Sequence, residues 1–231
     1  MIESNSRNNY AENTGTLQFH LWSKFEIENE RPGWLAFRLS DSGIAEWLEY
    51  LRTSEPSPSH GQVQSPSESA PTPNQRSQLA IWQAQYAHAR CTSILKQWPS
   101  VPVRLRRPQA VYACEPARIP WLDSGDRLQI QSPAAVGLIH TLITVIDDMF
   151  WIPYRYPTKQ YFLLLKRTSQ LYQAFEAFYR QCLPGFPQSS WEDASTGHCH
   201  RQAYIGLILV TQKVLKALLI EHLGQIPPDE L

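Results

Sequence analysis

The sequence predicts a mainly α-helical protein, a helical bundle preceded by a small α+β unit. Beyond residue 78, apolar side chains recur with the 3.6-residue period of a helix over four long segments. Before residue 53, the apolar residues instead form short or alternating runs that are typical of strands. A stretch rich in Ser and Pro separates the two parts. We therefore predict a small α+β unit over residues 1–52, a linker over 53–78 and a helical domain over 79–231.

The N-terminal unit combines two strand-like runs with one helix. Residues 17–21 and 34–39 have the short or alternating apolar pattern of strands. Ser40 and Asp41 then predict a capped helix start. The apolar residues of this helix are Ile44, Trp47, Leu48 and Leu51. Because about fifty residues bury little apolar surface by themselves, we expect this unit to pack on the C-terminal part.

Residues 53–78 consist mostly of Ser, Pro, Gln and Glu, with almost no apolar residue. Such a segment gains too little from burial to offset the conformational entropy lost on ordering. The composition therefore predicts a disordered linker.

Four helices are predicted in the C-terminal part, over residues 79–98, 133–150, 158–182 and 201–223. The inward stripe of the first contains Ala84, Ala87, Cys91, Ile94, Leu95 and Trp98. The stripe of the third contains Phe162, Leu165, Tyr172, Phe175, Phe178, Tyr179 and Cys182. The stripe of the last contains Tyr204, Leu207, Ile208, Val214, Leu215, Leu218 and Leu219. Several prolines make residues 99–132 irregular, and this segment carries the basic run of Arg104, Arg106 and Arg107.

Composition narrows the function classes. The chain is 42% hydrophobic and 18% charged, which is typical of a globular protein. Its net charge is zero, but residues 1–75 hold 5 Lys and Arg against 10 Asp and Glu, and the remainder holds 16 against 11. The net charge is therefore -5 over residues 1–75 and +5 over residues 76–231. We expect any polyanionic ligand to bind the C-terminal part. We find no uninterrupted apolar run of about 18 residues and a polar N-terminus, so we expect a cytoplasmic protein without a membrane partner.

The cysteines give no metal-binding pattern. The four are Cys91, Cys114, Cys182 and Cys199, and no two form a C-x-x-C pair. His198, Cys199 and His200 are adjacent, and adjacent side chains converge poorly on one ion. We expect neither a metal site nor a cofactor.

Three segments, read together, resemble the arginyl-tRNA synthetase family. Residues 85–95, QYAHARCTSIL, are similar to that family's signature on the first helix after the catalytic domain. Residues 171–182, LYQAFEAFYRQC, resemble its helix that ends in an aromatic pair and a cysteine. Residues 201–231 resemble its terminal helix, with a leucine-glycine turn and prolines. Their order and spacing resemble the DALR anticodon-binding domain.

A fourth segment resembles another part of the same enzymes. Residues 32–51, PGWLAFRLSDSGIAEWLEYL, are similar to the end of the additional N-terminal domain of these synthetases. In the family, the catalytic domain with its HIGH-type and KMSKS-type ATP-binding motifs follows. Here the predicted linker follows, and neither motif occurs in the chain. We therefore expect a protein without catalytic residues.

The resemblance implies a bundle that holds the anticodon stem and loop of a tRNA, with arginine tRNAs as first candidates. Exposed bases stack on aromatic rings and Arg planes. The face of the first helix opposite its apolar stripe carries Trp82, Tyr86, Arg90, Ser93 and Gln97. The other candidate contacts are Arg104, Arg106, Arg107, the Tyr179 hydroxyl and the terminal Leu231, where the family commonly has a methionine.

Each assignment has an alternative. Tyr86 and Arg90 also suit a solvated helix face, the three arginines suit a solvated loop, and His88 suits packing. At the level of function, tRNA binding competes with a bundle reused for binding proteins, and with a part that acts in trans with a synthetase or tRNA-modifying enzyme. The neutral charge and the acidic N-terminal unit favour the protein-binding alternative.

Overall fold

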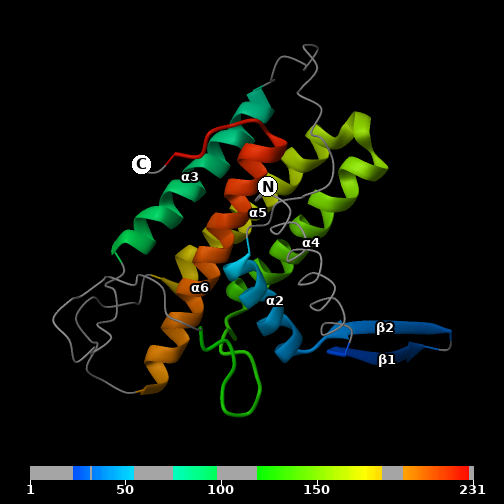
Figure 1. Ribbon diagram of the computed structural model, residues 1–231, viewed down its shortest axis with the longest axis vertical. Coiled ribbons are helices and arrows are strands. Elements are labelled where there is room, and N and C mark those ends of the chain that lie inside the picture. Colours follow the sequence, from blue (N-terminus) through cyan, green and yellow to red (C-terminus); the bar gives the residue numbers. More distant parts are fainter. Residues whose placement is uncertain (1–22, 32, 55–74, 98–118, 184–194, 229–231) are drawn as a thin grey trace, which may run out of the picture.

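The computed structural model describes residues 23–31, 33–54, 75–97, 119–183 and 195–228. These residues form a mainly helical structure with one small antiparallel sheet of two strands, as predicted at that level. Figure 1 shows the long helices side by side, with the sheet projecting from one end of the assembly.

The projecting sheet is a hairpin. Strand β1 (Phe25–Arg31) pairs with β2 (Trp34–Leu39), with Phe25 opposite Leu39 and Ile27 opposite Phe37. Gly33 between the strands has a φ of +86°, a conformation that favours glycine. β2 was predicted, whereas β1 was missed because its sequence, FEIENER, is dominated by charged and polar residues. The other predicted strand, residues 17–21, lies outside the described residues.

Helix α2 (Asp41–Thr53) follows the hairpin directly. The Ser40 hydroxyl accepts a hydrogen bond from the Gly43 amide at 3.2 Å, so the predicted cap is confirmed. Leu48 and Leu51 on this helix are buried.

Four long helices form the bundle: α3 (Gln75–Gln97), α4 (Pro133–Arg155), α5 (Gln160–Cys182) and α6 (Ser195–Ala217). A short 3-10 turn, η1 (Pro157–Lys159), joins α4 to α5, and a π-helical turn, η2 (Leu218–His222), continues α6. α4 packs along α5, while α3 packs on both α5 and α6. α3 begins within the predicted linker, and α6 begins six residues early, because the first turns of both helices carry few apolar residues.

The core lies where the four helices meet. Fully buried side chains on three of them include Leu138, Leu142, Leu171, Phe175, Phe178, Leu207, Ile208 and Leu215. The predicted stripes are largely confirmed, but Phe162 is an error: it is 68% exposed. It stands in the first turn of α5, directly after the turn that joins α4 to α5.

Helix α2 is docked on the bundle by polar contacts as well as by burial. Trp121 donates its indole N–H to Glu49 Oε2 at 2.9 Å, and the Leu128 amide donates to Asp41 Oδ2 at 2.9 Å. From α6, the Lys213 ammonium donates to the carbonyl of Arg52 at 2.5 Å. The expected packing of the N-terminal unit therefore holds for α2.

Two segments, Pro133–Arg155 and Arg201–His222, are long and apolar enough to cross a membrane by length and composition. Both supply fully buried residues, such as Leu138 and Leu207, to the shared core. Packing accounts for their buried apolar residues, as in core helices generally, but the end of α4 keeps exposed rings such as Trp151.

Candidate nucleic-acid interface

A cluster of rings and charges joins α3 to α5. The Arg90 guanidinium donates to the Tyr86 hydroxyl at 2.5 Å and lies 3.4 Å from Glu176 Oε1. Its central carbon is 3.9 Å from the centroid of the Tyr179 ring and 5.3 Å from that of Tyr86. We call Tyr86, Arg90, Glu176 and Tyr179 the Arg90 cluster. The structure thus brings Tyr179, a separate candidate in the sequence, to Tyr86 and Arg90, which were predicted on one helix face.

The cluster keeps Arg90 charged. Burial works against the charge, but the Tyr179 hydroxyl, Tyr86 and Glu176 outweigh it and raise the pKa of Arg90 above its ordinary value. Glu176 also lies 3.5 Å from Arg180, one turn further along α5. The carboxylate therefore has a cation on both sides.

Trp82 extends the cluster along α3 toward solvent. Its ring stacks on Tyr86, with centroids 5.4 Å apart and an interplanar angle of 21°. Trp82 is 56% exposed, so part of its surface is open. A row of π-systems therefore runs from Trp82 through Tyr86 and Arg90 to Tyr179, with its outer end accessible.

The predicted outward face of α3 is less open than expected. Trp82 and Gln97 are exposed, but Tyr86 and Arg90 are half-buried because they turn toward α5. Ala89, on the same side of the helix, is fully buried. Tyr86 and Arg90 are therefore not fully solvated, although the cross-turn contact that goes with a helix face is present between them.

Glu176 was missed in the sequence. Its spacing of four residues from Arg180 is the usual signal of an ion pair on a helix. That signal alone would not have indicated the contact with Arg90, which joins residues 86 positions apart.

The C-terminal tail, residues 224–228, lies across α3 (Figure 1). Gly224, with a φ of +61°, ends the last helical turn. His88 Nδ1 is 2.9 Å from the Pro228 carbonyl oxygen, and the Gln85 amide donates to the Ile226 carbonyl at 3.2 Å. The prediction of a packing role for His88 is confirmed, since the ring is buried and hydrogen-bonded.

Several predicted contacts lie outside the described residues, namely Arg104, Arg106, Arg107 and Leu231. In the sequence, Leu231 comes three residues after Pro228, the last described residue of the tail. The side chains of His198, Cys199 and His200 are also outside the description, although their backbone belongs to α6 and not to the predicted loop.

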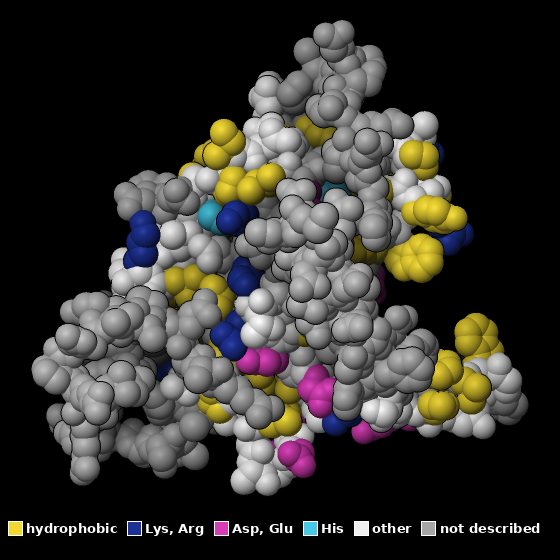
Figure 2. All heavy atoms as spheres, in the orientation of Figure 1, with side chains coloured by type: hydrophobic (Ala, Val, Ile, Leu, Met, Phe, Trp, Pro, Cys, Tyr) yellow, Lys and Arg dark blue, Asp and Glu magenta, His cyan; other side chains and the backbone are white. Residues whose placement is uncertain are grey.

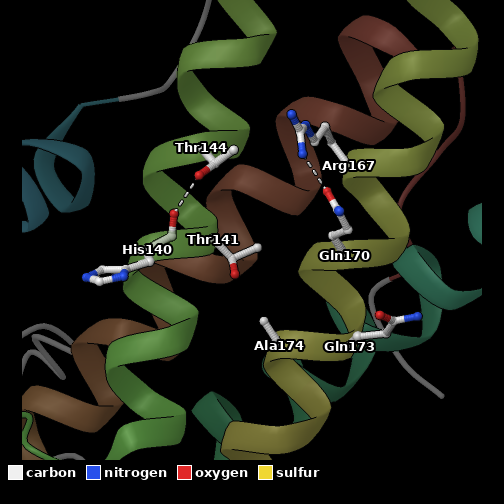
Figure 3. A pocket seen from close by; sticks show the side chains of 7 residues that line it. All are labelled: His140, Thr141, Thr144, Arg167, Gln170, Gln173 and Ala174. Carbon is white, nitrogen blue, oxygen red and sulfur yellow. Dashed lines mark hydrogen bonds between the residues drawn. The ribbon is translucent and has the colours of Figure 1, made fainter.

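A polar groove of about 490 Å³ lies between α4 and α5 (Figure 3). It is lined by His140, Thr141, Thr144, Arg167, Gln170, Gln173 and Ala174. Arg167 donates to Gln170 Oε1 at 2.7 Å and pairs with Asp148. The groove thus offers amide, hydroxyl and imidazole groups, and sequence reasoning did not indicate it.

Comparisons with protein-family models, curated proteins and solved structures gave no match.

Proposed function

We propose that this chain is a non-catalytic relative of the arginyl-tRNA synthetases that binds tRNA through a DALR-type anticodon-binding bundle. The observation that carries the proposal is the row of π-systems that runs from exposed Trp82 on α3 to Tyr179 on α5. Unpaired bases of RNA are bound by stacking on such rings. The net charge of +5 beyond residue 75 supports a polyanionic ligand.

Within this surface, Trp82 and Arg90 have different roles. The exposed ring of Trp82 is available to stack with a base. Arg90 is occupied by Tyr86, Tyr179 and Glu176, so it acts as a positioning residue that fixes the rings. This differs from the direct contact with RNA that the sequence suggested for Arg90.

The tail across α3 supports the same interface. Its contacts with Gln85 and His88 hold Ile226 and Pro228 on the helix that carries Trp82. In the arginyl-tRNA synthetases that the chain resembles, the terminal residue lies near the anticodon. The proposed binding surface therefore combines the Trp82 end of α3 with the tail that leads to Leu231.

The test is a binding titration of tRNA with Trp82→Ala. Because Trp82 is exposed, the variant should fold normally and bind tRNA at least about fivefold more weakly, the loss expected for one stacked base. The matched control is Trp34→Ala on β2, a tryptophan that is 72% exposed and far from α3. Equal affinity in both variants would exclude Trp82 from the interface.

A second candidate is a protein-interaction module, and the hairpin favours it. The antiparallel register places Ile27, Leu35 and Phe37 on one face, and all three are exposed. Figure 2 shows hydrophobic side chains gathered on this projecting element. Exposed apolar patches of this kind often mark binding surfaces. Recovery of a specific protein partner from nuclease-treated lysate, lost in Phe37→Ser, would support it.

A further inference from the structure

Exposed aromatic residues gather at the turn between α4 and α5. Trp151 is 64% exposed and Tyr154 is 84% exposed. The whole set, which we call the aromatic tip, is Phe150, Trp151, Tyr154, Tyr156 and Phe162. Figure 2 shows hydrophobic and basic side chains at this corner of the molecule. None of these rings fills the core, so packing does not explain the concentration of exposed rings.

The charge of the tip is basic. Residues 149–163 contain Arg155 and Lys159 but no Asp or Glu. Both cations are exposed, and the Arg155 guanidinium lies 5.6 Å from the centroid of the Tyr156 ring. Asp147 and Asp148 lie one turn before Trp151 on α4, and Asp148 pairs with Arg167. Among the described residues, Arg155 and Lys159 form no ion pair, and exposed cations beside rings are suited to an anionic ligand that also stacks.

The polar groove lies further along the same two helices as the aromatic tip. His140, Thr144 and Trp151 recur at intervals of four and seven residues, so they share one face of α4. On α5, Phe162 and Gln170 are eight residues apart and share a face in the same way. The groove and the aromatic tip therefore lie at successive levels of the same two helices, with Asp147 and the Arg167–Asp148 pair between them.

We propose that the aromatic tip and the adjoining polar groove form a second RNA-binding surface that holds a single-stranded segment. Bases stack on Trp151 and Tyr154, the cations contact phosphates, and groups such as Gln170 bond to base edges. The polar groove favours RNA over a lipid surface, because acyl chains gain nothing from its amide and hydroxyl groups.

This inference rests on the proposed function, in that it takes the ligand to be RNA. Phe162 and Tyr179 are 17 residues apart on α5, which corresponds to roughly 26 Å of helix. The tip and the Arg90 cluster therefore contact different parts of one RNA. Removing either surface should weaken binding without abolishing it.

The experiment uses the full chain, total tRNA and an unstructured oligouridylate of about 12 nucleotides, which suits one single-strand site. The combined variant Trp151→Ala and Tyr154→Ala should bind both probes at least about fivefold more weakly. The aromatic variant Trp151→Phe and Tyr154→Phe should restore most of the affinity, which a loss of folding would not explain. Trp34→Ala again serves as the control for removal of an exposed ring.

The outcomes separate the two surfaces. If the tip variant loses affinity for RNA and Trp82→Ala does not, the result supports the tip as an RNA-binding surface and excludes Trp82 on α3 from binding. If Trp82→Ala loses affinity for RNA and the tip variant does not, the proposal of a second surface at the tip is overturned, and the proposed surface on α3 stands. Binding to phosphatidylserine vesicles that depends on Trp151 and Tyr154, with unchanged RNA affinity, would also overturn it in favour of a membrane contact.

Discussion

The guanidinium carbon of Arg90 lies 3.9 Å from the centroid of the Tyr179 ring, and this contact connects α3 to α5. The same guanidinium reaches Tyr86 and Glu176, so one side chain bridges three groups. A planar cation with several donors can make such contacts at once, whereas an ammonium cannot.

Arg90→Lys should therefore lower the free energy of unfolding by about 1–3 kcal/mol, because it leaves the half-buried Glu176 with poorer hydrogen bonding. Urea unfolding measures the change. The control is Arg180→Lys, which alters the other partner of Glu176 at an exposed position and should cost less than about 1 kcal/mol. Equal effects in the two variants would show that the contact with Tyr179 contributes little.

Gly206 on α6 permits a close approach of the 119–130 segment. A Cβ there would meet the side chain of Ile119 and would lie 2.5 Å from Trp121 Cη2. Gly206→Ala should therefore destabilise the protein by about 1–3 kcal/mol. Gly137→Ala on α4, where nothing lies within 4 Å of the added atom, should stabilise it by about 0.5–1 kcal/mol. In thermal unfolding, Gly206→Ala should lower the melting temperature and Gly137→Ala should raise it. An unchanged melting temperature in Gly206→Ala would contradict the close packing of Ile119 and Trp121 on α6.

The tail is held to α3 by His88 and Gln85. His88→Ala removes the group next to the Pro228 carbonyl and opens space beneath the tail, so the amide hydrogens of residues 224–226 should exchange faster. Ser93→Ala on the same helix, which contacts only the local carbonyl of Ala89, is the control and should leave exchange in the tail unchanged. Unaltered exchange in His88→Ala would mean that the tail is fixed by other contacts.

His222 in η2 makes stability depend on pH. Burial lowers its pKa below the ordinary value, and neither ring nitrogen has a hydrogen-bond partner among the described residues. The unfolded chain therefore binds a proton at higher pH than the folded one, so stability should fall as pH is lowered through about 6.5. His222→Gln should flatten this dependence in thermal unfolding. His140→Gln, at an exposed position on α4, should preserve it.

Periodicity predicted the helices and most of their buried stripes, because core contacts leave a local repeat in the sequence. It misplaced Phe162, since a repeat does not indicate where the neighbouring helix ends. It placed Tyr86 and Arg90 on one helix face but gave Tyr179 only as a separate candidate. The contact of Arg90 with Tyr179 depends on how α3 crosses α5, which is a property of tertiary packing. The aromatic tip was missed for a related reason, since its residues continue the apolar pattern of α4.

The most direct measurement is a titration of the purified chain with total tRNA and with an unstructured RNA of equal length, at about 50 and 200 mM salt. We predict tighter binding of tRNA, with an affinity that falls steeply as the salt concentration rises. Equal affinity for the two RNAs, or binding of neither, would contradict a tRNA-binding role and turn attention to the exposed hairpin as a protein-binding surface.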